Sequence, residues 1–243
     1  MSHLISNMKI TTFVQHDFVN PDDLSGQAAV VIDTFRATTT MTTALQNGAA
    51  CMIPVMHVKD ALAIKAQDSD VLLGGERRTQ KIDGFDFGNS PLEYTAQAVG
   101  GRRVVMSTTN GTKAVMAAKK AATIMLGCLN NASAVAEKLA KLQLDVTLLC
   151  AGTVGRLSME DLLTAGMIIA HLQQICDVTL CDTSITARDM YIMHQSDING
   201  VLKNTAHYNT MLKNDLAGDI AFCMQTDICS TVPVFDGTGF VKK

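Results

Sequence analysis

In the segment VVIDTFRATTT, residues 30–40, a strand-like run is followed by polar residues that are able to bind a cation or an anion. Asp33 ends the apolar run, and an aspartate at a strand end is a natural ligand for a hard cation such as Mg²⁺. Arg36 could hold an anion through two parallel hydrogen bonds. The helix-like segment that follows begins with three β-branched residues, Thr38, Thr39 and Thr40, which form helices poorly. Such a conflict between local sequence and structure is expected at functional sites. The alternative is a turn capped by Asp33, with Arg36 in a surface ion pair.

Two further polar segments follow strand-like runs. In GGERR, residues 74–78, Glu76 would emerge beside a strand end, although a solvated turn is the simpler interpretation. In VVMSTTNGTKAV, residues 104–115, the free amides at a helix start favour anion binding around Asn110, Gly111 and Thr112. This segment is not a Walker loop, because the pattern G-x-x-x-x-G-K-[ST] is absent from it. An Asn-Gly turn with a threonine cap is the alternative.

The segment LLCAGTVGRLSMEDLLTAG, residues 148–166, allows three interpretations. Ser158 and Asp161 fit a helix capping box that only satisfies backbone groups. Asp161 could instead be another carboxylate that faces a metal ion. Finally, Cys150 and Arg156 form a C-x5-R pattern between a strand and a helix. Cysteine phosphatases use this spacing to place a thiolate nucleophile inside a phosphate-binding loop.

The elements that must position these residues alternate along the chain. Strand-like runs are predicted at 10–14, 28–33, 51–55, 71–73, 103–107, 123–126 and 146–150, with helices near 38–48, 58–67, 91–98, 112–120 and 131–142. This alternation predicts an α/β fold with a mostly parallel or mixed sheet flanked by helices. Ligands of such sheets bind outside the carboxyl ends of the strands. We therefore expect Asp33, Glu76, Asn110 and Cys150 to converge at one edge.

The pattern changes in the last part of the chain. Residues 1–175 are predicted to form the α/β catalytic core. Residues 176–243 are predicted to form a smaller helical subdomain with a final strand at 232–235, although the whole chain could also be one domain. The helical pattern from 182 to 216 is rather polar, which suits a cap over the core.

Composition restricts the classes of partner. The chain has 243 residues, 47% of them hydrophobic, and a net charge of −3, so it lacks the basic surface of a nucleic-acid-binding protein. No apolar stretch approaches the roughly 18 residues that span a membrane. The seven cysteines contain no C-x-x-C pair, which argues against zinc and for reduced thiols. We predict a cytoplasmic protein with a small-molecule partner, and a homodimer as its oligomeric state.

Five segments together resemble the 2-phosphosulfolactate phosphatase family. They are, in order, VVIDTFRATTT, GGER, GFDFGNSP, TTNGT and CAGTVGRLSMEDLLTAG. The resemblance covers most of the chain to about residue 170. It implies an α/β fold and a Mg²⁺-dependent acid phosphatase that acts on a phosphorylated, sulfonated hydroxy acid. In its best-known members this activity belongs to coenzyme M biosynthesis.

The resemblance and the residues together predict one arrangement. Substrate oxyanions would be bound by Arg36, Thr38, Thr39 and the segment Asn110, Gly111 and Thr112. Mg²⁺ would be held by Asp33, Glu76 and Asp161, with Asp33, Arg36 and Asp161 as the catalytic residues. The expected nucleophile is a water molecule rather than Asp33, because Asp33-Thr34-Phe35 lacks the second aspartate of a D-x-D signature. Two alternatives stay open, a metal-independent cysteine phosphatase using Cys150 and Arg156, and a non-catalytic anion-binding protein.

Overall fold

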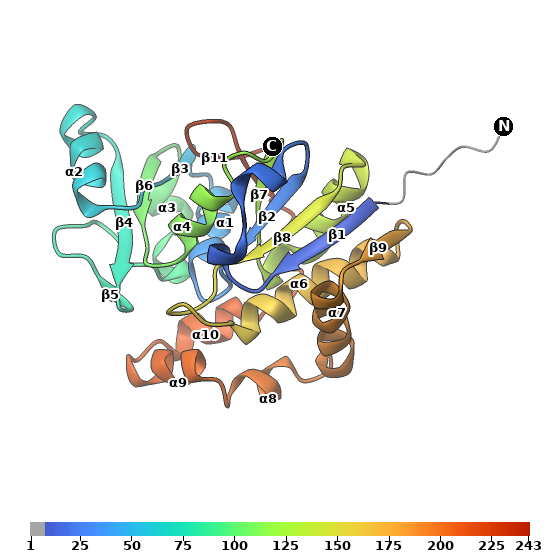
Figure 1. Ribbon diagram of the computed structural model, residues 1–243. Coiled ribbons are helices and arrows are strands. Elements are labelled where there is room, and N and C mark those ends of the chain that lie inside the picture. The colour runs from blue at the N-terminus through green and yellow to red at the C-terminus, as the bar shows by residue number, and fades with distance from the viewer. Residues whose placement is uncertain (1–7) are drawn as a thin grey trace.

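A central β-sheet determines where the functional residues meet. The computed structural model describes residues 8–243, and within them the sheet has eleven strands. Across the sheet the strands follow the order β5-β4-β6-β3-β11-β10-β7-β2-β8-β1-β9 (Figure 1). The strands are β1 (Met8–Phe13), β2 (Ala28–Ile32), β3 (Cys51–Pro54), β4 (Leu72–Arg77), β5 (Gln80–Lys81), β6 (Arg103–Ser107), β7 (Thr123–Gly127), β8 (Val146–Cys150), β9 (Val178–Leu180), β10 (Pro233–Phe235) and β11 (Phe240–Lys242). The helices are α1 (Ala37–Gln46), α2 (Val58–Gln67), α3 (Ala96–Val99), α4 (Gly111–Ala117), α5 (Ala132–Leu142), α6 (Met159–Gln173), α7 (Asp182–His194), α8 (Ile198–Leu202), α9 (Ala206–Lys213) and α10 (Ala217–Cys223).

Strand β2 explains why helices cover both faces of the sheet. All five of its residues are buried, and successive side chains point to opposite faces. Ala28, Val30 and Ile32 pack in one core with α5, α6 and α7. Ala29 and Val31 pack in a second core with α1 and α4. Burying each Val or Ile side chain contributes about 1.5–3 kcal/mol, so a continuous apolar strand is stable only between two helical layers. The predicted α/β fold, with a sheet flanked by helices, is confirmed.

A hairpin from the end of the chain joins two groups of parallel strands. One group contains β4, β6 and β3, and the other contains β7, β2, β8, β1 and β9. Between them, Val234 of β10 pairs antiparallel with Met125 of β7, and Phe240 of β11 pairs antiparallel with Met52 of β3. The sheet is therefore mixed. Strand β10 corresponds to the strand predicted at 232–235, whereas the three-residue β11 escaped the sequence pattern because of its shortness.

Strand β4 extends beyond the run predicted at 71–73. It continues to Arg77, so Glu76 lies inside the strand and pairs with Lys81 of β5. Gly74 and Gly75 permit this extension, since a Cβ atom at Gly75 would collide with the carbonyl oxygen of Ser107 on β6. The two glycines thus let β4 lie close to β6 up to its end, which carries Glu76 to the margin of the sheet.

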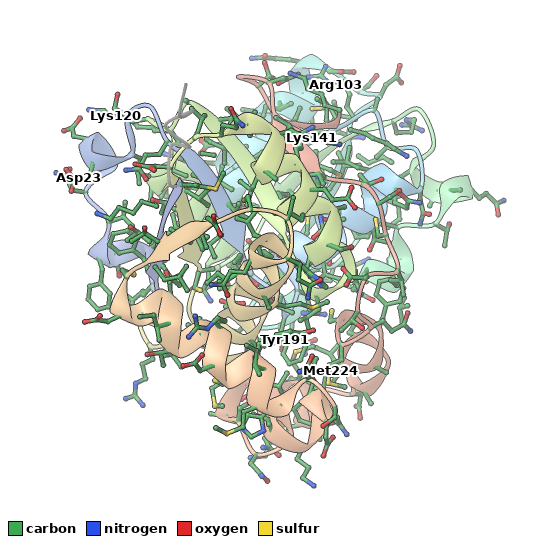
Figure 2. The ribbon with its side chains drawn as sticks, turned by 90° about the vertical axis from the view of Figure 1, so that its right-hand side faces the viewer. Asp23, Arg103, Lys120, Lys141, Tyr191 and Met224 are labelled. Carbon is green, nitrogen blue, oxygen red and sulfur yellow. The ribbon has the colours of Figure 1, made fainter. Side chains whose placement is uncertain are left out.

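The last quarter of the chain contributes both helices and strands. Figure 1 shows α7 to α10 gathered along one side of the sheet, below β1 and β8. These helices share a core with the loop after β2 and with α6, formed by Phe35, Leu163, Leu202, Met211, Ile220 and Cys223. Tyr191 and Met224, both labelled in Figure 2, pack partly buried against this core. Because β9, β10 and β11 belong to the main sheet, the division after residue 175 stays a prediction.

Two local features differ from the sequence pattern. The helix predicted at 91–98 is divided into a 3-10 helix, Pro91–Glu93, and the single turn of α3, because Thr95 starts a new helix by accepting a hydrogen bond from the amide of Ala98. Within residues 8–243, none of the helices combines the length and the apolar character needed to cross a membrane.

Candidate active site

A cavity of about 500 Å³ lies where the loops after β2, β6 and β8 meet the end of β4 and helix α9. Its lining is rich in hydroxyl, amide, carboxylate and guanidinium groups. The lining residues are Asp33, Phe35, Arg36, Glu76, Arg78, Thr79, Asn89, Thr108, Thr109, Asn110, Thr153, Val154, Arg156, Ala206, His207 and Thr210. The structure therefore brings Asp33, Glu76 and Asn110 together at one cavity.

Asp33 is a buried carboxylate that lines the cavity. Its backbone N–H donates to Thr38 Oγ1 over 3.0 Å, and its Oδ1 accepts from the Ala37 amide over 3.3 Å. Burial raises the pKa of Asp33 to about 6, an effect that the positive charge of His207 opposes and the negative charge of Glu76 reinforces. A buried carboxylate with this elevated pKa has a strong electrostatic reason to bind a cation.

The threonine cluster positions the loop after β2 and does not reach the cavity. Thr38 donates to the carbonyl of Gly127, and Thr39 donates to the carbonyl of Thr34, each over less than 3 Å. Thr40 donates in the same way to the carbonyl of Asn89. These threonines are fully buried and absent from the cavity lining. Their hydroxyls thus join the start of α1 to neighbouring backbone, which explains why threonine occupies a helix start.

Glu76 connects two loops through one carboxylate. Its Oε1 accepts from the backbone N–H of Thr109 over 2.8 Å and from the hydroxyl of the same residue over 2.7 Å. Its Oε2 accepts from the Thr79 amide over 2.8 Å. Glu76 is only 7% exposed, yet it contributes to the cavity surface. The alternative of a solvated turn is therefore wrong for this segment.

Arg36 lies in the cavity wall as half of a buried ion pair. Its Nη1 donates to Asp219 Oδ2 of α10 over 2.7 Å, and its Nη2 donates to the carbonyl of Thr79 over 3.1 Å. The hydroxyl of Ser90 donates to the other oxygen of Asp219. The interpretation of Arg36 as a member of a surface pair is wrong, since both partners are about 5% exposed. Two of its five N–H groups have an acceptor within residues 8–243, and the others remain for an anion.

Asp161 lies behind the cavity rather than on its surface. Its Oδ1 accepts from the Thr34 amide over 2.8 Å, and its Oδ2 accepts from the Gly152 amide over 3.1 Å. Burial, reinforced by the charges of Glu160 and Asp33, raises its pKa well above the ordinary value. Both oxygens thus hold the loops after β2 and β8 together. The sequence pattern could not separate this role from metal binding, because both place a carboxylate at a helix start.

The segment after β6 is divided between cavity and core. Asn110 lines the cavity as the residue before α4, whereas the Thr112 hydroxyl donates to the carbonyl of Thr108 and is buried. Gly111 sits against the loop after β2 and the start of α1, and a Cβ atom there would lie 2.7 Å from Ala37 Cβ and 2.9 Å from Asp33 Oδ2. The absence of a side chain at this position lets α4 begin beside Asp33.

Cys150 is packed in the hydrophobic core between β8 and the helices α5 and α6. It is 1% exposed, and burial raises the pKa of its thiol well above the ordinary value. A nucleophilic cysteine requires the opposite conditions, namely access to the substrate and a stabilised thiolate. Arg156 does line the cavity, but Cys150 does not, so the structure contradicts the C-x5-R interpretation.

His207 and Glu160 form a pair that the sequence pattern did not predict. His207, from α9, lines the cavity, and its Nδ1 lies 2.6 Å from Glu160 Oε1 and 3.2 Å from the Thr153 hydroxyl. The predicted capping box is also wrong, because Ser158 makes no side-chain cap bond and instead donates to Glu160 over 2.5 Å. The acidic segment SMED marks Glu160 as a possible functional carboxylate. Nothing nearby in the sequence, however, indicates its partner 47 residues away.

Three buried oxygen atoms of the cavity wall are unsatisfied. Thr79 Oγ1, Asn89 Oδ1 and Thr108 Oγ1 have no hydrogen-bond partner within the described part of the chain, although all three residues line the cavity. Buried polar atoms normally have a partner, so these oxygens point to bound water or ligand. No three His, Cys, Asp or Glu side chains of residues 8–243 gather closely enough to enclose a metal ion by themselves.

Comparisons with known proteins show the family to which this chain is related. A family model described as 2-phosphosulpholactate phosphatase matches residues 14–238. A protein of Clostridium acetobutylicum named "Probable 2-phosphosulfolactate phosphatase" is 39% identical over 94% of this chain and 97% of its own length. A protein of the same name in Clostridium botulinum strain Alaska E43 is 40% identical over 97% of this chain and 100% of its own length. Another, in Caldicellulosiruptor saccharolyticus, is 41% identical over 94% of this chain and 97% of its own length. The chain belongs to the 2-phosphosulpholactate phosphatase family.

Proposed function

We propose that this chain is a Mg²⁺-dependent phosphatase that hydrolyses 2-phosphosulfolactate, or a closely related phosphorylated hydroxy acid, to the free hydroxy acid and inorganic phosphate. The observation that carries the proposal is the joint presence of two buried carboxylates, Asp33 and Glu76, and several guanidinium groups in one cavity. Buried carboxylates repel a phosphate unless a cation lies between them. A site of this composition suits a cation together with a multiply charged anion.

The donor set fits Mg²⁺. This ion prefers oxygen ligands and is usually held in proteins by one or two carboxylates, several waters and the phosphate of the substrate. Asp33 and Glu76 would supply the carboxylates, and the unsatisfied oxygens of Asn89 and Thr108 would accept from its bound waters. When bound, Mg²⁺ polarises the phosphoryl group and lowers the pKa of a water molecule. Asp161 would act by positioning Asp33, since it does not line the cavity and its oxygens hold the loops after β2 and β8.

The anionic groups of the substrate would be bound by the cationic side of the cavity. Arg36 and the start of α4 near Asn110 lie next to Asp33 and would hold the phosphoryl oxygens. Arg78 and Arg156 line the same cavity, are exposed, and have no ion pair or hydrogen-bond acceptor for their guanidinium groups within residues 8–243. They would bind a sulfonate or carboxylate. Thr38 and Thr39 would support this arrangement from behind by holding the loop after β2.

Phosphate release measured with and without Mg²⁺ tests the proposal. The purified chain should release phosphate from 2-phosphosulfolactate in Mg²⁺, and EDTA should abolish the activity. Tight binding of the substrate without turnover would favour the non-catalytic anion-binding alternative. Activity that resists EDTA would exclude the metal-dependent reaction.

The remaining expectations concern the cell and the assembly. The cysteines Cys51, Cys128, Cys150, Cys176, Cys181, Cys223 and Cys229 are free thiols, the state that a reducing compartment maintains, which supports a cytoplasmic site of action. A homodimer stays a prediction, and sedimentation velocity would test it.

A further inference from the structure

We propose that His207 is the general acid of the reaction, donating the proton on its Nε2 atom to the oxygen that leaves phosphorus, and that Glu160 is the positioning residue that orients the ring by accepting the proton on Nδ1. The inference rests on the proposed function and extends it. It assigns a catalytic role to the C-terminal helices, which supply His207 through α9.

The geometry leaves one ring nitrogen of His207 for the substrate. A carboxylate only accepts hydrogen bonds, so the 2.6 Å contact requires Nδ1 to carry a proton that it donates to Glu160 Oε1. Nε2 has no hydrogen-bond partner within residues 8–243, and the side chain lines the cavity. The ring is also held by an edge contact with Phe35, with 6.0 Å between the ring centroids. The pair thus presents a single free nitrogen at the cavity.

Three charged groups on different elements act on the ring. Glu160 of α6 is 1% exposed and contacts it directly, Asp33 follows β2, and Arg36 precedes α1. Burial alone would lower the pKa of His207, but the hydrogen bond and charge of Glu160, together with the charge of Asp33, raise it above the ordinary value, while Arg36 opposes them. The surroundings therefore favour the imidazolium over the neutral ring, and the imidazolium is the form that an acid catalyst needs.

The proposed substrate class needs such an acid. Hydrolysis breaks the bond between phosphorus and the oxygen on the hydroxy-acid carbon, and an alkoxide is a poor leaving group. As that bond breaks, the Nε2 proton moves to the leaving oxygen and gives the neutral alcohol. The oxygen of the attacking water forms the new bond to phosphorus, and the proton that this water loses is released to solvent. A solvent proton then restores the imidazolium, so atoms and charge balance.

The test compares His207→Gln with wild type on two esters that differ in their need for an acid. 2-Phosphosulfolactate has an alkoxide leaving group, whereas 4-nitrophenyl phosphate has a leaving group that departs without protonation. We expect kcat on 2-phosphosulfolactate to fall about 10²- to 10⁴-fold, the usual contribution of a general acid. The rate on 4-nitrophenyl phosphate should change much less. His171→Gln is the matched control, because His171 pairs with Asp227 over 2.9 Å outside the cavity, and it should leave both rates unchanged.

The pH dependence gives an independent readout. Wild-type kcat on 2-phosphosulfolactate should fall at alkaline pH as His207 loses its proton, and this fall should be absent from the residual activity of His207→Gln. Glu160→Gln should move the fall to lower pH, because it keeps an acceptor for Nδ1 but removes the charge that favours the imidazolium.

Equal losses on both esters, or an alkaline fall that persists in His207→Gln, would overturn the assignment. If the aryl ester is not a substrate of the wild type, the pH profiles alone decide. A wild type that hydrolyses no phosphate ester would instead refute the proposed function, so the two failures can be distinguished.

Discussion

Arg36 and Asp219 form an ion pair of 2.7 Å that is almost completely buried and connects the loop after β2 to helix α10. Arg36 lines the cavity, and Asp219 belongs to the C-terminal helices. The pair therefore joins the two parts of the chain at the site itself.

Asp219→Ala should destabilise the fold strongly. It leaves the Arg36 guanidinium buried without its counterion, and breaking a buried pair in this way costs about 3–5 kcal/mol. Urea unfolding measures the loss. Asp68→Ala is the control, since its pair with Arg103 is exposed on both sides and is worth at most about 1 kcal/mol. Similar losses in the two variants would show that the buried pair has no special structural role.

Asp33→Asn should abolish activity and yet stabilise the protein at neutral pH without divalent cations. Burial raises the Asp33 pKa from 3.8 to about 6, so the folded state binds this proton more tightly than the unfolded chain does. This group therefore lowers the free energy of unfolding as the pH rises from about 4 to about 6, by up to about 3 kcal/mol. Urea unfolding should show the more stable variant at about pH 7.5, with the advantage disappearing near pH 4. A variant less stable than wild type at pH 7.5 would contradict the sign.

Mg²⁺ should raise the melting temperature of the wild type. A ligand at about 100 times its Kd adds about 2.7 kcal/mol, which corresponds to about 5–10 °C for a chain of this size. Differential scanning fluorimetry in Mg²⁺ should show this rise, and Asp33→Asn and Glu76→Gln should lose it. Asp145→Asn, at a remote site where the carboxylate accepts from the Lys9 amide, should keep it. A full shift in Glu76→Gln would remove Glu76 from the metal site.

Cys150→Ser should be less stable but active. The substitution buries a hydroxyl in an apolar core, at a cost of about 1–3 kcal/mol. Turnover should persist because Cys150 does not reach the cavity. Phosphate release, measured at a temperature where the variant is folded, should remain within a few-fold of wild type and stay sensitive to EDTA. An inactive, folded variant would restore the thiol mechanism.

Arg156→Ala should weaken substrate binding without affecting stability. The side chain is exposed, and such substitutions usually change stability by less than about 0.5 kcal/mol. Losing one charge-assisted hydrogen bond to the substrate should cost about 1.5–3 kcal/mol of transition-state stabilisation, which lowers kcat/KM roughly 10- to 150-fold. Steady-state kinetics on 2-phosphosulfolactate measures the loss, with the exposed Arg102 as the control position, since among residues 8–243 its guanidinium binds the Asp70 carbonyl alone. An unchanged kcat/KM would place the second anionic group of the substrate elsewhere.

The sequence by itself determined most of the strands and several positions of the site. Continuous apolar runs predict β2, β6 and β8 almost to the residue, because a strand buried on both faces needs an apolar side chain at nearly every position. Asp33 follows such a run directly and Asn110 follows one after two residues, so their approach to one cavity could be predicted from the general position of ligands in α/β sheets. Local patterns were sufficient here because the positions depend on where each strand ends.

Only the tertiary structure decided which partners each polar side chain has. Arg36 meets Asp219 across 183 positions, and Glu160 meets His207 across 47, distances over which no local period carries information. The same limit applies to Asp161 and the threonines, whose oxygen atoms serve backbone groups brought close by folding. A side chain's type shows that it can donate or accept a hydrogen bond. Its actual partner depends on how the sheet, the terminal hairpin and helices α9 and α10 pack together. This packing determines which buried backbone and charged groups still lack a hydrogen-bond partner.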